Sequence, residues 1–204
     1  MGRFAKLFGR ERQPQKETLL PNDIIIPVVG LIGVGKSTFI NEATGENSAA
    51  VGGDLRPCTT AFQSIVTHSR DGSRRIIFVD TPGFEYNDSG DYENTVRELY
   101  TWMSSTGNAK IAGVIYLYDI TQDRMQTRPN AGRFHAGRAQ MARSVVLVTT
   151  KWDAVGQQAG KRREEELAKT FWKDMIKQGS RIFQSSNDRQ STWSIIDLII
   201  ANAD

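Results

Sequence analysis

The sequence predicts an α/β fold of three layers, in which helices cover both faces of a mostly parallel sheet with one antiparallel hairpin strand. Short runs rich in Val and Ile alternate along the chain with segments of helical periodicity. A glycine-rich stretch at residues 30–37 joins the first apolar run to a helical segment. Only one pair of β-rich runs is joined by a short polar turn, which indicates a single hairpin.

The first half of the chain supplies a strand, a helix and the hairpin. The apolar run 24–29 is typical of a buried strand, but Pro27 cannot donate to a sheet ladder, so we expect this residue near a strand end or a bulge. The other elements expected here are a helix over 36–44 and hairpin strands over 61–67 and 74–79, joined by the turn residues Asp71 and Gly72.

The second half continues the alternation of buried strands and helices. Residues 111–118 and 145–149 are β-branched apolar runs, which predict buried strands. Helices are expected over 92–103 and 161–177, a short strand over 181–184, and a last helix from about Ser191. The side chains of 161–177 expected to face the core are Leu167, Phe171, Met175 and Ile176.

Length and composition indicate one folded domain with a basic arm before it. The chain has 204 residues, 39% hydrophobic and 24% charged, which is enough for one well-buried core. We assign residues 22–204 to this domain and residues 1–21 to a flexible arm, which carries the basic excess behind the net charge of +3. Cys58 is the only cysteine, and no apolar run approaches a membrane span, so we expect a cytoplasmic protein.

The arm has two interpretations that the sequence leaves open. Phe4, Leu7 and Phe8 fall on one helical face among basic residues, a pattern typical of a short helix lying on an anionic membrane. A disordered basic tail is the alternative. The first interpretation predicts weak, peripheral contact with a membrane surface.

A run of arginines between residues 124 and 143 is the other charged feature of the chain. It fits a dimer face, an anion patch or an ordinary solvated face. Aromatic residues are not interleaved with it beyond Phe134, so nucleic-acid binding is not expected.

The segment GLIGVGKS at residues 30–37 matches the phosphate-binding pattern G-x-x-x-x-G-K-[ST]. Its glycines let backbone N–H groups point at phosphate oxygens, and the helix that follows adds its positive N-terminus. We expect Lys36 to face solvent without a ligand and to reach the β- and γ-phosphates with one, while Ser37 takes a Mg²⁺ position. The nucleotide-binding residues predicted here are Gly30, Gly33, Val34, Gly35, Lys36, Ser37 and Thr38.

Two further segments predict the metal site and the γ-phosphate contacts. Asp80 ends a buried strand in DTPG, where a carboxylate orients Mg²⁺, and the Gly83 N–H is placed to sense the γ-phosphate. In RPCTT, either Thr59 or Thr60 closes the Mg²⁺ shell, and spacing does not choose between them. The predicted metal residues are Ser37, Thr59, Thr60 and Asp80, and the predicted catalytic residues are Lys36, Thr59, Thr60, Gly83 and Arg56.

Arg56 is the least determined of these residues. If Thr59 is the metal ligand, Arg56 stands three residues ahead of it, where a guanidinium would reach the phosphates in cis. The alternative is an arginine exposed on a loop.

The end of another strand, in TTKWD, carries Thr150, Lys151 and Asp153. A carboxylate at 153 offers two acceptors to the N1–H and 2-amino donors of guanine, whereas adenine presents an acceptor at that place. A site of this kind discriminates by roughly 10⁴–10⁵. The stem of Lys151 would cover the face of the base. The sequence therefore predicts a site for GTP or GDP with Mg²⁺.

In this order the motifs resemble those of the translation-factor-related (TRAFAC) class of P-loop GTPases over roughly residues 22–200. GLIGVGKSTFIN, DTPGF, YLYDITQDRM and LVTTKWD are similar to septin, GIMAP (immunity-associated) and Toc GTPases, and most similar to fungal proteins described only by a G domain. The resemblance implies a P-loop G domain. It also implies a further guanine contact in the loop 185–187, at Ser186 and Asn187.

The chain departs from that pattern in the base and catalytic segments. Thr150 stands where most such GTPases have Asn, so one anchor between the base loop (150–153) and the phosphate loop (30–37) is altered. Phe84 stands where a Ras-like enzyme has the glutamine that positions water, and Ile32 is apolar too. The resemblance thus implies slow hydrolysis of GTP to GDP and phosphate, or a water-positioning group supplied by another residue or by a second subunit of a nucleotide-dependent homodimer. The alternatives are an assembly module that binds nucleotide without hydrolysing it, and an ATPase that uses the same loop.

Overall fold

The computed structural model describes residues 19–49, 62–83, 97–98, 101, 110–122 and 145–202. Most of the basic arm, the loop that carries Arg56, Thr59 and Thr60, and the arginine run after residue 123 lie outside these ranges. Of the helix expected over 92–103, only residues 97, 98 and 101 are described, and these three are helical. Among the helices described, none combines the length and apolarity needed to span a bilayer.

Strands and helices alternate along the described chain as the sequence predicts. The strands are β1 (Ile24–Gly30), β2 (Gln63–His68), β3 (Arg75–Asp80), β4 (Lys110–Ile111), β5 (Val114–Asp119), β6 (Val145–Thr150) and β7 (Arg181–Gln184). The helices are α1 (Lys36–Thr44), a 3₁₀ turn (Trp152–Ala154), α4 (Gln157–Glu166), a π-helical segment (Leu167–Phe171), α5 (Lys173–Lys177) and α6 (Arg189–Ala201).

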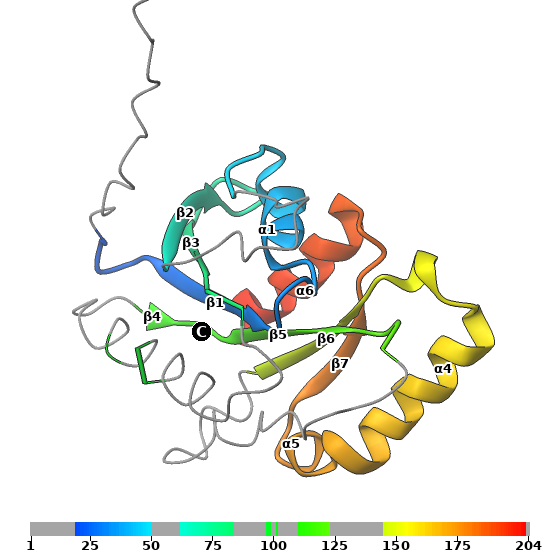
Figure 1. Ribbon diagram of the computed structural model, residues 1–204. Coiled ribbons are helices and arrows are strands. Elements are labelled where there is room, and N and C mark those ends of the chain that lie inside the picture. The colour runs from blue at the N-terminus through cyan, green and yellow to red at the C-terminus, as the bar shows by residue number, and fades with distance from the viewer. Residues whose placement is uncertain are drawn as a thin grey trace, which may run out of the picture.

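One mixed sheet forms the middle layer, with strand order β2-β3-β1-β5-β6-β7 and β4 paired with β1. All pairings are parallel except β2 with β3, which form the predicted antiparallel hairpin. Helices α1 and α6 cover one face of the sheet, and α4 and α5 cover the other (Figure 1). The predicted three-layer α/β/α fold is therefore confirmed.

The core is divided by the sheet into two apolar layers. On one side Ile26 and Val28 of β1 belong to a cluster with Ile40 of α1 and Trp193 and Ile196 of α6. The other side gathers apolar residues of β5 and β6 with those of the π-helical segment and α5. Every residue of β1 is buried, because the strand is covered on both faces, and this explains its uninterrupted apolar run.

We expected Pro27 near a strand end or a bulge; it lies away from both ends of β1 but beside an irregularity of the sheet. It is the fourth residue of β1 and pairs in register with Val79 of β3. The irregularity lies in the strands on the other side of β1. Ile25 of β1 pairs with Ile111 of β4 and Val28 pairs with Ile115 of β5, so the β4–β5 segment has one residue more than the part of β1 that it faces. Pro27 faces this interruption between β4 and β5, where the ladder needs no donor from it. The strand predicted over 111–118 is accordingly divided in two.

The helix predicted over 161–177 begins earlier and changes its winding. It starts at Gln157, and after Glu166 the Trp172 N–H donates to the Leu167 carbonyl at 2.8 Å, a π-type bond. Leu167 and Met175 are buried as expected. The wider turn also buries Trp172 completely, with its ring edge-on to Tyr118 at a centroid distance of 5.9 Å.

Candidate functional site

Those predicted site residues that the structure describes lie at one edge of the sheet. Strands β1, β3, β5, β6 and β7 are mutually parallel, so their carboxyl ends reach the same edge. In open α/β sheets ligands bind in the crevice outside these ends. The residues that end the five strands are Gly30, Asp80, Asp119, Thr150 and Gln184.

The phosphate loop takes a backbone conformation that requires glycine. Gly33 has φ +77° and Gly35 has φ +97°, in the left-handed region that other residues rarely adopt. A Cβ built on either residue would meet no atom within 4 Å, so the space beside the loop is open. Helix α1 begins at Lys36, directly after Gly35, and its N-terminal N–H groups therefore belong to the loop.

The Lys36 side chain is buried, contrary to our expectation that it faces solvent. The residue is 7% exposed, and its ammonium donates to the carbonyls of Gly30 at 3.3 Å and Leu31 at 3.1 Å. Burial lowers the pKa of Lys36 to about 8, against the opposing charge of Asp80. The loop thus folds back on its own cation, which remains poorly solvated and attractive to an anion.

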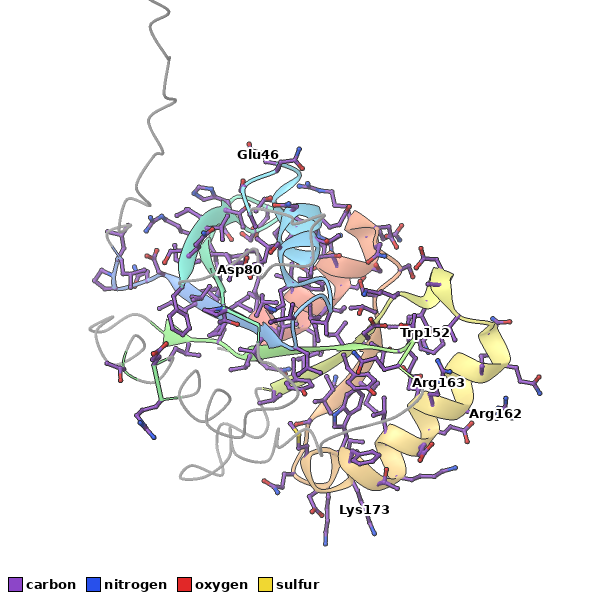
Figure 2. The ribbon with its side chains drawn as sticks, viewed as in Figure 1. Glu46, Asp80, Trp152, Arg162, Arg163 and Lys173 are labelled. Carbon is purple, nitrogen blue, oxygen red and sulfur yellow. The ribbon has the colours of Figure 1, made fainter. Side chains whose placement is uncertain are left out.

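A hydroxyl and a carboxylate lie together at the end of α1 nearest the loop. The Ser37 hydroxyl donates to Asp80 Oδ2 at 2.9 Å, and Asp80 is fully buried (its position appears in Figure 2). Both oxygens are of the hard type that Mg²⁺ prefers, so the residues present fit this ion. Within the described ranges no three His, Cys, Asp or Glu residues cluster, so further ligands would come from phosphate, water or the segment of Thr59 and Thr60.

The loop after β3 packs directly on the phosphate loop. A Cβ built on Gly83 would lie 2.7 Å from the backbone nitrogen of Ile32 and 2.6 Å from its Cγ1, so no larger residue fits there without a shift. Thr81 ties the same loop to β1, because its hydroxyl donates to the Val28 carbonyl at 2.9 Å. Gly83 is therefore held beside residues 30–37, where its predicted contact with a γ-phosphate would be made.

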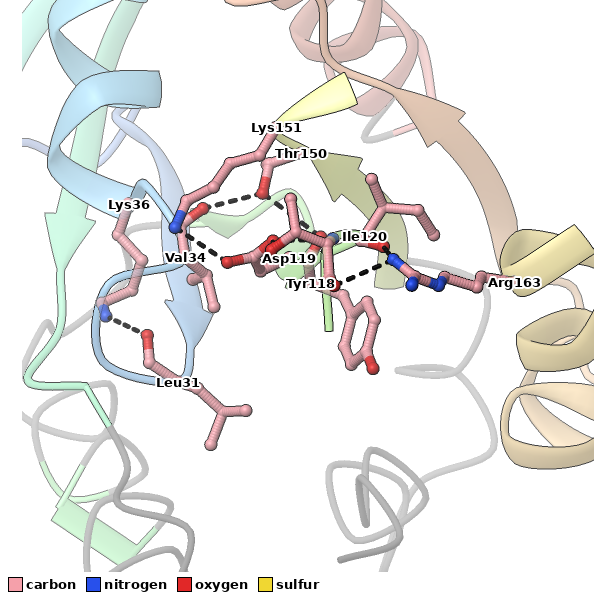
Figure 3. Close-up of polar contacts among 10 residues, drawn as sticks. Leu31, Val34, Lys36, Tyr118, Asp119, Ile120, Thr150, Lys151 and Arg163 are labelled. Carbon is pink, nitrogen blue, oxygen red and sulfur yellow. Dashed lines mark hydrogen bonds and ion pairs between the residues drawn. The ribbon is translucent and has the colours of Figure 1, made fainter. Parts of the chain in front are cut away.

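A hydrogen bond joins the base loop to the phosphate loop (Figure 3). The Thr150 hydroxyl lies 2.8 Å from the Val34 carbonyl and 3.2 Å from the Tyr118 carbonyl, although Thr150 and Val34 are 116 residues apart. With Thr at position 150 in place of Asn, a hydroxyl takes the place of the amide, and the two loops are still joined by a hydrogen bond. A hydroxyl has one proton, so it serves these two acceptors in alternation.

Removal of this anchor is expected to loosen the base loop. Thr150→Val keeps the shape of the side chain and deletes the donor, so we expect unfolding stability to fall by about 1–3 kcal/mol, the usual cost of a lost buried hydrogen bond. Urea unfolding followed by circular dichroism measures this. Thr170→Val, at an exposed threonine of the π-helical segment, is the matched control. Equal stability of Thr150→Val and wild type would show that the hydroxyl contributes nothing.

Lys151 and Asp119 hold the base loop from the β5 side. Lys151 is one of two described non-glycine residues with positive φ, at +60°, and its ammonium pairs with Asp119 Oδ2 at 2.8 Å (Figure 3). The other Asp119 oxygen accepts from the Thr121 N–H at 2.9 Å. Asp153 lies exposed on the 3₁₀ turn that follows, so its carboxylate is accessible to a ligand.

The loop 185–187 reaches the same edge after β7. The Ser185 N–H donates to the Thr149 carbonyl at 2.8 Å, which places the loop next to the end of β6. Ser186 and Asn187 are exposed, and Asn187 has φ +52°. Their contact with guanine stays a prediction, as do the roles of Arg56, Thr59 and Thr60, which lie outside the described residues.

Our reading of the sequence missed three residues that support this edge: Asp119, Arg163 and Glu164. Arg163 donates to the carbonyls of Ile120 at 2.9 Å and Thr121 at 2.8 Å, and Figure 2 shows it on the sheet side of α4, opposite Arg162. A carboxylate ending a buried strand was a usable signal for Asp119. The charged run around 161–166 offered no comparable signal for the two helix residues.

The fold and this edge define the chain as a P-loop GTPase G domain. It belongs to the 50S ribosome-binding GTPase family, whose model matches residues 25–151. GTPase Der of Synechocystis is 27% identical over 190 residues, covering 91% of this chain and 39% of that protein. GTPase Era of Bordetella petrii is 27% identical over 149 residues, covering 70% and 43%. The chain thus spans less than half the length of the curated relatives it matches.

Solved structures share the fold. A dimerization-deficient mutant of Toc33 from Arabidopsis thaliana aligns with a TM-score of 0.67 at 15% identity, covering 89% of this chain and 84% of that one. Toc33 in complex with Mg²⁺ and GMPPNP aligns with a TM-score of 0.64 at 18% identity, covering 89% and 85%. The class that the motifs resemble is confirmed, with Era and Der as relatives. Toc33 shares the fold, and the septin, GIMAP and fungal likenesses stay predictions.

Proposed function

We propose that this chain is a Mg²⁺-dependent guanine-nucleotide switch that hydrolyses GTP slowly. The observation that carries the proposal is the 2.8 Å contact between the Thr150 hydroxyl and the Val34 carbonyl. It sets the base loop at a defined place relative to the phosphate loop, so one ligand can engage both ends. A generic phosphate-binding loop needs no such connection.

The chain's own residues divide the work of binding and catalysis. Ser37 and Asp80 would hold Mg²⁺, which neutralises charge on the β- and γ-phosphates. Lys36 would turn its ammonium from the Gly30 and Leu31 carbonyls to the phosphates. The Gly83 N–H would meet the γ-phosphate beside Ile32. Catalysis then consists of positioning and charge stabilisation for in-line attack by water.

Hydrolysis by the single chain is expected to be slow because apolar residues stand where the γ-phosphate and the attacking water would lie. Ile32 is 37% exposed beside Gly83, and Phe84 follows in the sequence, so neither residue can orient a water molecule. Dimerization is important for the GTPase activity of the chloroplast translocon components atToc33 and psToc159, whose structure shares this fold. We propose that a second copy of this chain supplies the missing group.

The dimer proposal predicts that hydrolysis depends on protein concentration. Phosphate release per molecule from GTP, measured over a hundredfold range of protein concentration, is expected to rise with concentration. The same series analysed by light scattering with a non-hydrolysable GTP analogue should show dimer at the concentrations where activity rises. A flat rate per molecule would contradict the dimer, and no phosphate release at any concentration would favour the non-hydrolysing assembly module.

Competition separates the guanine site from an ATP site. Unlabelled GDP should displace a fluorescent GDP analogue at concentrations at least 10³-fold lower than ATP, since a carboxylate at 153 rejects adenine. Comparable displacement by ATP would contradict the guanine assignment and restore the ATPase alternative.

A further inference from the structure

Glu164 of α4 connects the two strands that carry the base-reading loops. Its Oε1 accepts from the Thr149 hydroxyl at 2.8 Å, and its Oε2 accepts from the Gln184 amide at 2.7 Å. Thr149 and Gln184 are register partners on β6 and β7. The base loop begins one residue after Thr149, and the loop 185–187 begins one residue after Gln184. Glu164 therefore holds the two residues that directly precede these loops.

The same hydroxyl extends this bridge to the residue before Asp153. Thr149 is fully buried, and its oxygen accepts from the Trp152 indole N–H at 2.9 Å. Its one proton serves Glu164 at 2.8 Å and, at the longer distance of 3.3 Å, the Phe183 carbonyl. The Trp152 ring also packs on α4, because a Cβ built on Gly160 would lie 2.6 Å from it. The position of Trp152, and of the 3₁₀ turn that presents Asp153, therefore depends on Glu164 through one shared hydroxyl.

The neighbouring residue of α4 supports the opposite side of the base loop. Arg163 donates to the carbonyls of Ile120 and Thr121, and Asp119 beside them pairs with Lys151 (Figure 3). Two consecutive helix residues thus hold the chain after β5 and the carboxyl ends of β6 and β7. The support comes from side chains of fixed donor and acceptor character, which constrain orientation as well as distance.

We propose that Glu164 is a positioning residue for recognition of the nucleobase, acting on Asp153 through Thr149 and Trp152. The inference rests on the proposed guanine site and adds the element that aligns it. Glu164 acts in this proposal through Thr149 and Gln184, with no contact to the ligand assigned to it. Its loss should therefore reduce the discrimination between bases and leave the phosphate end of the site unchanged.

The test compares GDP with IDP, which lacks the 2-amino group. The ratio of their dissociation constants reports the second hydrogen bond to Asp153, for which we expect about 10- to 100-fold preference for GDP in the wild type. Glu164→Ala is expected to reduce this preference for GDP at least fivefold. Glu165→Ala is the matched control, because Glu165 is exposed and pairs only with the exposed Lys169 among the contacts described. Partial unfolding affects both ligands equally, so it leaves the ratio unchanged.

A second pair of variants tests the bridge without truncating it. Gln184→Glu places a second carboxylate beside that of Glu164, and this repulsion should lower the preference for GDP over IDP. Adding Glu164→Gln to this variant restores one donor and one acceptor between the two positions, and Gln at 164 still offers an oxygen to the Thr149 hydroxyl. The double variant is therefore expected to recover at least half of the wild-type preference on a logarithmic scale.

The outcomes separate this inference from the proposed function. Failure of the wild type to prefer GDP over IDP and ATP would contradict the guanine site itself. A wild type that prefers GDP, together with a Glu164→Ala ratio within twofold of it, would overturn the role of Glu164 alone. A double variant no better than Gln184→Glu would overturn it as well.

Discussion

Lys36→Ala is expected to abolish detectable binding of GDP and GTP. The ammonium is the one charged side-chain group in direct contact with the phosphate-loop carbonyls in the described structure, at 3.3 Å from Gly30 and 3.1 Å from Leu31. Loss of a buried charge partner for phosphate is worth about 3–5 kcal/mol, which corresponds to a loss of affinity of roughly 10²- to 4 × 10³-fold. Isothermal titration calorimetry with GDP and Mg²⁺ measures the loss.

The stability of this variant needs a separate control because Lys36 is buried. Alanine removes two hydrogen bonds to loop carbonyls and also removes the penalty of burying an ammonium, so the two effects offset and we expect a net change of no more than about 2 kcal/mol. Lys173→Ala is the matched control, since Lys173 is an exposed lysine of α5 and lies away from the site (Figure 2). Unchanged GDP affinity in folded Lys36→Ala would contradict the assignment of the phosphate loop.

Asp153→Asn is expected to exchange GTP for XTP as the preferred nucleotide. The carboxylate offers two acceptors to the N1–H and 2-amino group of guanine, whereas an Asn amide sets an N–H donor against the 2-amino group. Xanthine carries a carbonyl in place of that amino group and keeps N1–H, so the Asn amide matches it. An unpaired buried donor costs about 1–3 kcal/mol, more when a charge is involved, so we expect GTP to weaken at least tenfold.

The structure sharpens this prediction in two ways. Asp153 is exposed at the loop edge, so the substitution should not disturb the core. The Thr150 anchor holds the base loop, so a general loosening of the site is not expected. Binding of GTP and XTP by titration gives the selectivity, and Asp174→Asn on α5 is the control for loss of one exposed carboxylate. A variant that still prefers GTP would show that Asp153 does not read the base.

The sequence alone determined the class of this protein, because its strongest signals are local. A phosphate loop forms from consecutive residues: glycines, a lysine and a serine between a β-rich run and a helix. Gly33 and Gly35 adopt the positive φ that such a loop requires. Strand β1 is buried on both faces, and its unbroken apolar run predicted this. The turn residues Asp71 and Gly72 predicted the hairpin of β2 and β3. Such patterns follow from the conformation of a few consecutive residues.

Only the tertiary structure decided the contacts that align the site. The tolerance of Pro27 depends on a one-residue shift in the strand beside it, and the burial of Lys36 depends on how its loop folds back. Thr150 meets Val34 across 116 residues, and Glu164 meets Thr149 and Gln184 only where a helix crosses two strand ends. These contacts depend on the register between strands and on the packing of the helix against the sheet, which no short stretch of sequence specifies.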